Sequence, residues 1–115
     1  MADVINPYDK AHELARALTD SEVYKRYGAA KAAVEKHPEY QEMILKIRNQ
    51  QMELNRAQIL GETMNNDNIL QLGQMFAQAN QIEEIAEFFK AESAFIQTFN
   101  DIMEIIQKAV TEGFN

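Results

Sequence analysis

Cysteine is absent from the 115-residue sequence, and glycine and proline are scarce, with four and two residues. The absence of cysteine excludes disulfide bonds, thiolate metal sites and cysteine nucleophiles. Because so few residues force the backbone to turn, we expect long secondary-structure elements. No apolar run approaches the ~20 residues that span a bilayer, and no basic region followed by an apolar core opens the chain. We therefore expect a cytoplasmic protein that makes no membrane contact.

Positive charge is also in short supply, since 18 acidic residues outnumber 11 lysines and arginines and leave a formal net charge of −7. Phosphate backbones repel such a chain, so direct binding of nucleic acid is not expected. Lys25, Arg26 and Lys31 lie close together in the sequence, with Lys36 just beyond. They could form a functional basic patch, but a solvated helix face is the simpler interpretation.

Motifs of enzymes are missing as well. The sequence has no glycine-rich phosphate loop, Walker sequence, nucleophile elbow or zincin pattern, so we predict no catalytic residue, metal, cofactor or enzymatic activity. Asp9 and His12 could share a helix face, but a carboxylate-bridged metal bundle needs further ligands that the sequence does not supply. The acidic cluster Glu83, Glu84 and Glu87 is explained by the favourable field at a helix N-terminus, with a cation site as the alternative.

The pattern that stands out is a seam of apolar residues near the C-terminus, spaced alternately by four and three positions. It comprises Ile85, Phe89, Ile96, Phe99, Met103, Ile106 and Val110. Such a seam is typical of a long helix packed against another helix. This last helix is predicted from about residue 81 to 111, with Asn80 and Glu83 as its cap. At 1.5 Å per residue it would be about 46 Å long, more than a compact monomer of this size needs.

Two short helices are predicted at the N-terminal end. Asn6 can cap the first helix, and Pro7 suits its first position. Thr19 and Glu22 have the spacing of a capping box, so the second helix is predicted to begin there. It is predicted to end at His37, because the following proline disfavours helical geometry in the residue before it.

A long third helix and a further short helix complete the prediction. The third helix runs from Pro38 to about Leu60 and stops at Gly61. Residues 65–68 are rich in asparagine and are predicted to form a loop. The short helix after this loop carries Ile69, Leu72, Met75 and Phe76.

Both long helices carry an extra apolar stripe at seven-residue spacing. The stripes are Phe88, Phe95, Ile102 and Ala109 on the last helix, and Leu45, Met52 and Ile59 on the third. Two apolar faces on one helix need two partners, and leaving Phe88, Phe95 and Ile102 in water would forfeit roughly 5–9 kcal/mol of burial. We therefore predict a homo-oligomer, most simply a dimer, whose interface includes the six large residues of the two stripes. Alternatively, the N-terminal helices fold back and cover the stripe of the last helix within one chain.

Glu92 is the one residue that interrupts the C-terminal seam. A buried carboxylate needs polar partners, and an antiparallel third helix would bring Gln51 or Asn55 near it. We interpret the three residues as a buried polar contact that sets the register of the helices. The alternative is a polar patch that recognises a partner or ligand.

Several segments together resemble the YlbF/YmcA family of small bacterial helical proteins, and most of all its uncharacterised YheA-like branch. The segments are 9–18 (DKAHELARAL), 21–27 (SEVYKRY), 37–39 (HPE), 41–44 (QEMI), 91–92 with Phe95, 100–102 (NDI) and 105–106. Each is weakly specific, but their order and spacing extend the resemblance over nearly the whole chain.

The resemblance implies an all-α fold with a long helical hairpin, oligomerisation through helix faces and a non-catalytic role. Some members of the family form complexes with each other and a third protein. Those complexes influence RNA processing by an endoribonuclease, and through it competence, sporulation and biofilm formation. Members in such complexes can carry iron–sulfur clusters through cysteines. This property does not transfer to a sequence without cysteine.

We therefore predict a single domain spanning residues 1–115, an all-α bundle built on a long antiparallel helical hairpin with short N-terminal helices. Its expected role is that of an interaction or regulatory protein that docks other proteins. The alternative function is binding of a small apolar ligand in a cleft between helices. Such a cleft could be lined by Met52, Met75, Phe76 and Met103.

Overall fold

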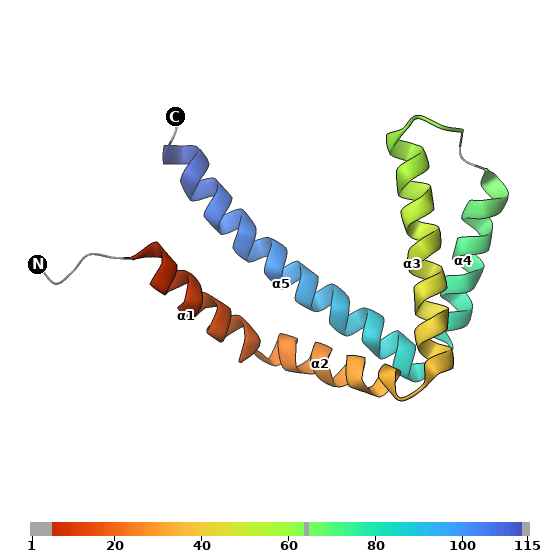
Figure 1. Cartoon of the computed structure of the whole chain (residues 1–115), viewed down its shortest axis with the longest axis horizontal. Helices are drawn as coiled ribbons and strands as arrows, with labels where there is room; N and C mark the ends of the chain where they lie inside the picture. The colour runs from red at the N-terminus through yellow and green to blue at the C-terminus, as the bar shows by residue number, and fades with distance from the viewer. Residues whose placement is uncertain (1–5, 64, 114–115) are drawn as a thin grey trace, which may run out of the picture. The chain divides into compact units, whose positions relative to one another are not determined.

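The computed structural model describes residues 6–63 and 65–113. Over these residues it contains five α-helices and no strand, which confirms the predicted all-α fold (Figure 1). The helices are α1 (Pro7–Thr19), α2 (Glu22–Glu35), α3 (Pro38–Ile59), α4 (Asn66–Asn80) and α5 (Glu83–Gly113).

The end of α3 follows the glycine signal in the sequence. Gly61 has a φ of 72°, a conformation that L side chains rarely adopt. Its N–H donates to the carbonyl of Gln58 at 3.2 Å, and the N–H of Glu62 donates to the carbonyl of Ala57 at 2.9 Å. These two bonds form a Schellman motif, which satisfies carbonyls that the helix itself leaves open.

The first helix begins as predicted, but the second uses a different cap. Asn6 Oδ1 accepts the N–H of Tyr8 at 2.9 Å, which confirms the cap of α1. Thr19, in contrast, is the last residue of α1, so the capping box predicted from it is wrong. Ser21 takes this place, because its hydroxyl accepts the N–H of Tyr24 at 3.3 Å.

The asparagine-rich stretch is also more helical than predicted. Asn65 Oδ1 accepts the N–H of Asp67 at 2.8 Å and thereby caps α4, so residues 66–68 form the first turn of a helix and not a loop. At the other end, Asn80 is the last residue of α4, whereas α5 begins at Glu83. The predicted cap at Asn80 is therefore wrong.

The contacts divide the chain into two compact units. The first unit holds the residues up to Ala29 and those from Ala91 onward, and the second unit holds Ala30–Lys90. Helices α2 and α5 contribute residues to both units. The single domain remains a prediction.

The second unit is built on an antiparallel hairpin of α3 and α4, which lie side by side (Figure 1). Its buried apolar residues are Ala30, Val34, Ile44, Ile47, Ala79, Ile85 and Phe88. Ile47 and Ile85 are almost completely enclosed, at 1% and 0% exposed. The rings of Phe76 and Phe89 add a tilted contact with centroids 5.6 Å apart. The second unit therefore has a small apolar core, to which α2 and α5 contribute residues together with the hairpin.

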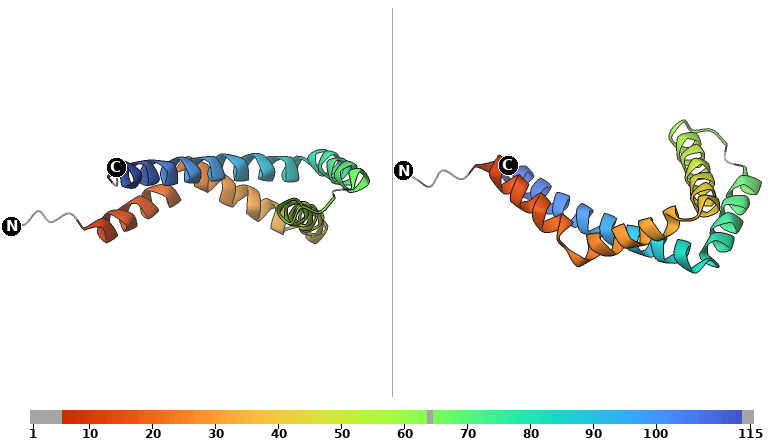
Figure 2. Two further views of the ribbon diagram at one scale, coloured as in Figure 1. Left: turned by 90° about the horizontal axis from the view of Figure 1, so that it is seen from above. Right: turned by 60° about the horizontal axis from the view of Figure 1, so that its bottom comes forward.

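In the first unit, α1 runs antiparallel to the C-terminal part of α5 (Figures 1 and 2). The start of α2 contributes Tyr27, whose ring stacks on Phe95 with centroids 5.4 Å apart and an interplanar angle of 3°. Tyr24 meets the same ring edge-on at 5.5 Å. None of the residues of α1 is buried, so much of this unit's apolar surface stays in contact with water.

Candidate docking surfaces

The α3 stripe, Leu45, Met52 and Ile59, lies on the surface. These residues are 58%, 67% and 84% exposed, whereas Ile44 and Ile47 of the same helix are buried. The arrangement follows from helix geometry, because residues seven apart share one face while their immediate neighbours point elsewhere. Large apolar side chains aligned over four turns are typical of a surface that binds another protein.

A groove of about 370 Å³ adjoins the stripe at Leu45, within the second unit. Its lining combines apolar residues with charged and polar ones: Lys31, Val34, Glu35, Gln41, Ile44, Leu45, Arg48 and Phe88. The guanidinium of Arg48 lies 5.6 Å from the centre of the Phe88 ring, a cation–π contact. Lys31 pairs with Glu35 at 4.0 Å. The groove therefore combines the exposed side chain of Leu45 with two cations that both already have partners within the chain.

The stripe predicted on the last helix is largely covered within the chain. Phe88 is 6% exposed, Phe95 packs against the tyrosines of α2, and Ile102 is half-buried. The coverage of Phe95 by Tyr24 and Tyr27 matches the alternative in which N-terminal helices fold back over this stripe. The proposed interface at these three residues remains a prediction, but little of Phe88 is left for a second chain.

A different part of α5 is left open, which the sequence did not indicate. The α5 seam, as we name it, comprises Ile96, Phe99, Met103, Ile106 and Val110. These five side chains are between 37% and 53% exposed. They continue the seam that begins at the fully buried Ile85, so the heptad pattern alone could not tell its covered part from its open part.

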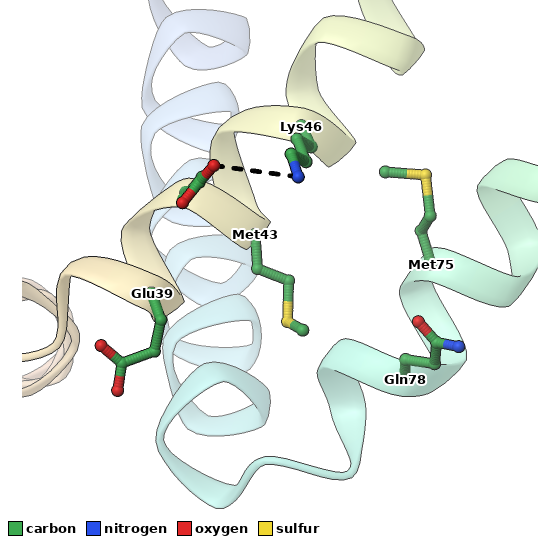
Figure 3. Close-up of a pocket in the computed structure, with 6 residues that line it drawn as sticks. Glu39, Met43, Lys46, Met75 and Gln78 are labelled. Atoms are coloured by element: carbon green, nitrogen blue, oxygen red, sulfur yellow. Dashed lines mark ion pairs between the residues drawn. The ribbon is translucent and has the colours of Figure 1, made fainter.

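Between α3 and α4 lies an open cleft of about 240 Å³ (Figure 3). Met43 extends from α3, and Met75 and Gln78 from α4, while Glu42 and Lys46 form an ion pair of 3.8 Å at its edge. Of the methionines proposed to line a ligand site, Met75 is thus in the cleft, but Met52 belongs to the exposed α3 stripe. The cleft is smaller than the ~300–1,000 Å³ of usual ligand pockets.

The predicted polar contact involves both units. Gln51 and Asn55 lie on α3 in the second unit, half-buried and exposed respectively. Glu92 lies on α5 in the first unit and is half-buried. The contact between them remains a prediction.

The candidate ionic sites of the sequence lie largely on exposed helix surfaces. Asp9 and His12 are both exposed on α1, as are Glu83 and Glu84 in the first turn of α5, whereas Glu87 is half-buried. Among residues 6–63 and 65–113, no three His, Asp or Glu side chains gather closely enough to hold a metal ion. The second helix, predicted to end at His37, ends at Glu35; His37 is the N-cap residue of α3, and its ring packs against Tyr40 with centroids 4.4 Å apart.

None of the helices in the described part of the chain is both long and apolar enough to cross a membrane.

The sequence is similar to a known family over almost its full length. A family model described as "Control of competence regulator ComK, YlbF/YmcA" matches residues 8–111. A UPF0342 protein of Caldicellulosiruptor saccharolyticus is 31% identical over 105 residues, which cover 91% of this chain and 88% of that protein. A UPF0342 protein of Staphylococcus epidermidis is 36% identical over 109 residues, which cover 94% of this chain and 95% of the relative.

Two solved structures share the fold. A protein of unknown function (DUF964) from Bacillus stearothermophilus has a TM-score of 0.80 at 25% identity, covering 93% of this chain and 95% of its own. A chain in the crystal structure of Bacillus subtilis RicA in complex with RicF has a TM-score of 0.62 at 16% identity, covering 98% of this chain and 100% of its own. The second likeness shows the fold alone.

Proposed function

We propose that this chain, which belongs to the YlbF/YmcA family, is a non-catalytic interaction protein that works in the cytoplasm as a helical oligomer and docks other proteins. The observation that carries the proposal is the α3 stripe, where Leu45, Met52 and Ile59 are each more than half exposed. Keeping three large apolar side chains in water forfeits their burial energy, and a binding partner restores it.

The groove beside the stripe indicates the chemistry of the partner. Leu45 is the exposed apolar residue of its lining and suits an apolar anchor, and the guanidinium of Arg48 over the Phe88 ring would attract a carboxylate of the partner. An amphipathic helix with an apolar face and an acidic residue satisfies both requirements. The overall charge of −7 would otherwise repel an acidic partner, so the local cations provide selectivity.

The relatives support a regulatory role. The family description refers to control of a competence regulator, and RicA is found in a complex with RicF. We extend the proposal to regulation of the kind that the family resemblance implies, in RNA processing, competence, sporulation or biofilm formation. The lack of cysteine means that this chain would act without a thiolate-bound cluster.

Capture of partners by a stripe variant tests the proposal. Met52→Glu places a charge in the α3 stripe, and Gln58→Glu places the same charge on a different, exposed face of α3. We expect a protein that the wild-type and Gln58→Glu chains capture from the native cell, that Met52→Glu loses, and that binds the purified wild-type chain. Identical captures by wild type and Met52→Glu would contradict the proposal.

The cleft between α3 and α4 supports the alternative of a small apolar ligand less well. Its volume of about 240 Å³ is small, and Glu39, Glu42 and Lys46 contribute charge to its lining. Native mass spectrometry of the purified protein decides the matter, because a stoichiometric copurifying ligand would favour this alternative.

A further inference from the structure

We infer that the α5 seam is covered by a second copy of this chain, with the two seams facing each other. The inference rests on the proposed function, because it names one partner of the oligomer and the surface that binds it. It concerns the first unit only, and it involves none of the residues of the α3 stripe.

The exposed apolar surface is continuous. Five side chains at alternating three- and four-residue spacing lie on one face of α5, from Ile96 to Val110, and each is about half exposed. Helix α1 runs beside this part of α5 but leaves the seam open, and Leu14 of α1 is itself 39% exposed. Two helices offer too few faces to enclose a core, whereas two copies would bring four helices together.

The exposed apolar area of the α5 seam can be compared with the area that a dimer interface buries. The exposed parts of the five side chains amount to roughly 400 Å², which is as large as the largest apolar patch on a typical monomer. Two such seams bury roughly 800 Å², and with the side chains beside them the contact would reach the ~1,000 Å² that is the lower limit for a specific interface.

The distribution of charge around the α5 seam favours a second copy of this chain as its binding partner. The positions that flank the seam are uncharged on both sides: Phe95, Ile102 and Ala109 on one, and Asn100 and Gln107 on the other. The charged residues of this part of α5 lie at positions outside the seam and its flanks, where Glu104 pairs with Lys108 at 3.2 Å and Asp101 accepts a hydrogen bond from Gln97 at 2.9 Å. Two copies of the α5 seam can therefore face each other without charged residues of α5 in the seam or at its flanks.

The α3 stripe, in contrast, has a charged residue among its apolar side chains. Arg48 lies between Leu45 and Met52 on the same face of α3, and a symmetric contact there would have to accommodate a cation from each copy. The seam is accordingly the surface for self-association, and the stripe remains available for a partner of different chemistry.

Cross-linking through a single cysteine tests the inference directly, because the chain has no cysteine of its own. Met103 is the middle residue of the seam, so two copies that align their seams over the full length bring the two Met103 residues close together in either helix orientation. We expect Met103→Cys to form a covalent dimer with a short bis-maleimide at low micromolar concentration. Lys108→Cys places the cysteine on the charged face of α5 and should not form this covalent dimer. Equal yields from the two variants, or no dimer from either, would overturn the inference.

Sedimentation velocity provides an independent reading. Phe99→Glu should raise the dissociation constant of the dimer by about 100-fold or more, because each interface loses two aromatic anchors. Thr111→Glu adds the same charge outside the seam and should leave the constant unchanged. Circular dichroism confirms that both variants remain helical. A Phe99→Glu dimer as tight as the wild type would count against the seam.

The two proposals fail separately. If the seam variants do not change the oligomer while Met52→Glu loses its partner, the docking function remains and the seam inference is wrong. If Phe99→Glu separates the copies while Met52→Glu captures the same proteins as the wild type, the dimer remains and the docking function of the α3 stripe is wrong.

Discussion

Replacing Ile47 by alanine should destabilise the fold by about 3 kcal/mol. Ile47 is 1% exposed and lies on the α3 face that forms the core of the second unit. The substitution removes three carbon atoms from a dry environment, which costs about 2.4 kcal/mol in transfer free energy. The cavity left behind adds about 1 kcal/mol or more, and the better helix propensity of alanine returns a few tenths.

Ile105→Ala is the matched control, because it makes the same substitution in a helix interior. Ile105 is 68% exposed, so little burial is lost, and the gain in helix propensity should keep the change in stability within about 0.5 kcal/mol. The difference between the two variants thus isolates the contribution of burial from that of helix propensity.

Urea unfolding followed by the helical circular dichroism signal measures both variants. All samples should have the same protein concentration, because self-association adds to apparent stability. For a chain of this length, about 3 kcal/mol corresponds to a melting temperature roughly 10–15 °C lower. If Ile47→Ala were within about 0.5 kcal/mol of Ile105→Ala, with an unchanged dependence on urea, the assigned core would be wrong.

Three further predictions concern local features. Gly61→Ala should lower stability by about 1 kcal/mol, because Gly61 has a positive φ. Gly73→Ala should raise stability by up to about 1 kcal/mol, since Gly73 lies inside α4 and an added Cβ would meet nothing within 4 Å. Thermal unfolding should therefore show a lower melting temperature for the first variant and a higher one for the second. Asn65→Ala should cost about 1 kcal/mol through loss of the α4 cap, and Asn65→Asp should restore it, as denaturant unfolding can show. A double-mutant cycle on Tyr27 and Phe95, each changed to leucine, should give a coupling of about 0.5–1.5 kcal/mol, and a coupling near zero would contradict the stacked contact.

Features set by a single residue's backbone preference could be predicted from the sequence. The cap at Asn6 and the stop at Gly61 depend on local chemistry that no distant contact changes, and both are found as predicted. The start of α2 was misplaced because Thr19 and Ser21 are both good caps, and only the path of the chain decides between them. The same ambiguity applies to asparagine, which is favoured in loops and at helix N-termini alike.

The candidate surfaces could be predicted only in part. Period-seven spacing identified the α3 stripe, whose residues are exposed while Ile44 and Ile47 on a neighbouring face of the same helix are buried. The same spacing could not show that Phe88 would be buried while Ile96 and Ile106 stay half exposed. A heptad pattern tells that a helix face needs a partner, but it does not tell which partner the rest of the chain supplies.

We propose that this chain acts through exposed helix faces and that one of these faces binds a second copy of the chain. Light scattering over a dilution series tests this directly, because it measures the mass of the wild-type protein in solution. We expect a mass of twice the 13.2 kDa of one chain at micromolar concentration, falling toward 13.2 kDa on dilution. A mass of 13.2 kDa that does not change up to the highest soluble concentration would contradict it.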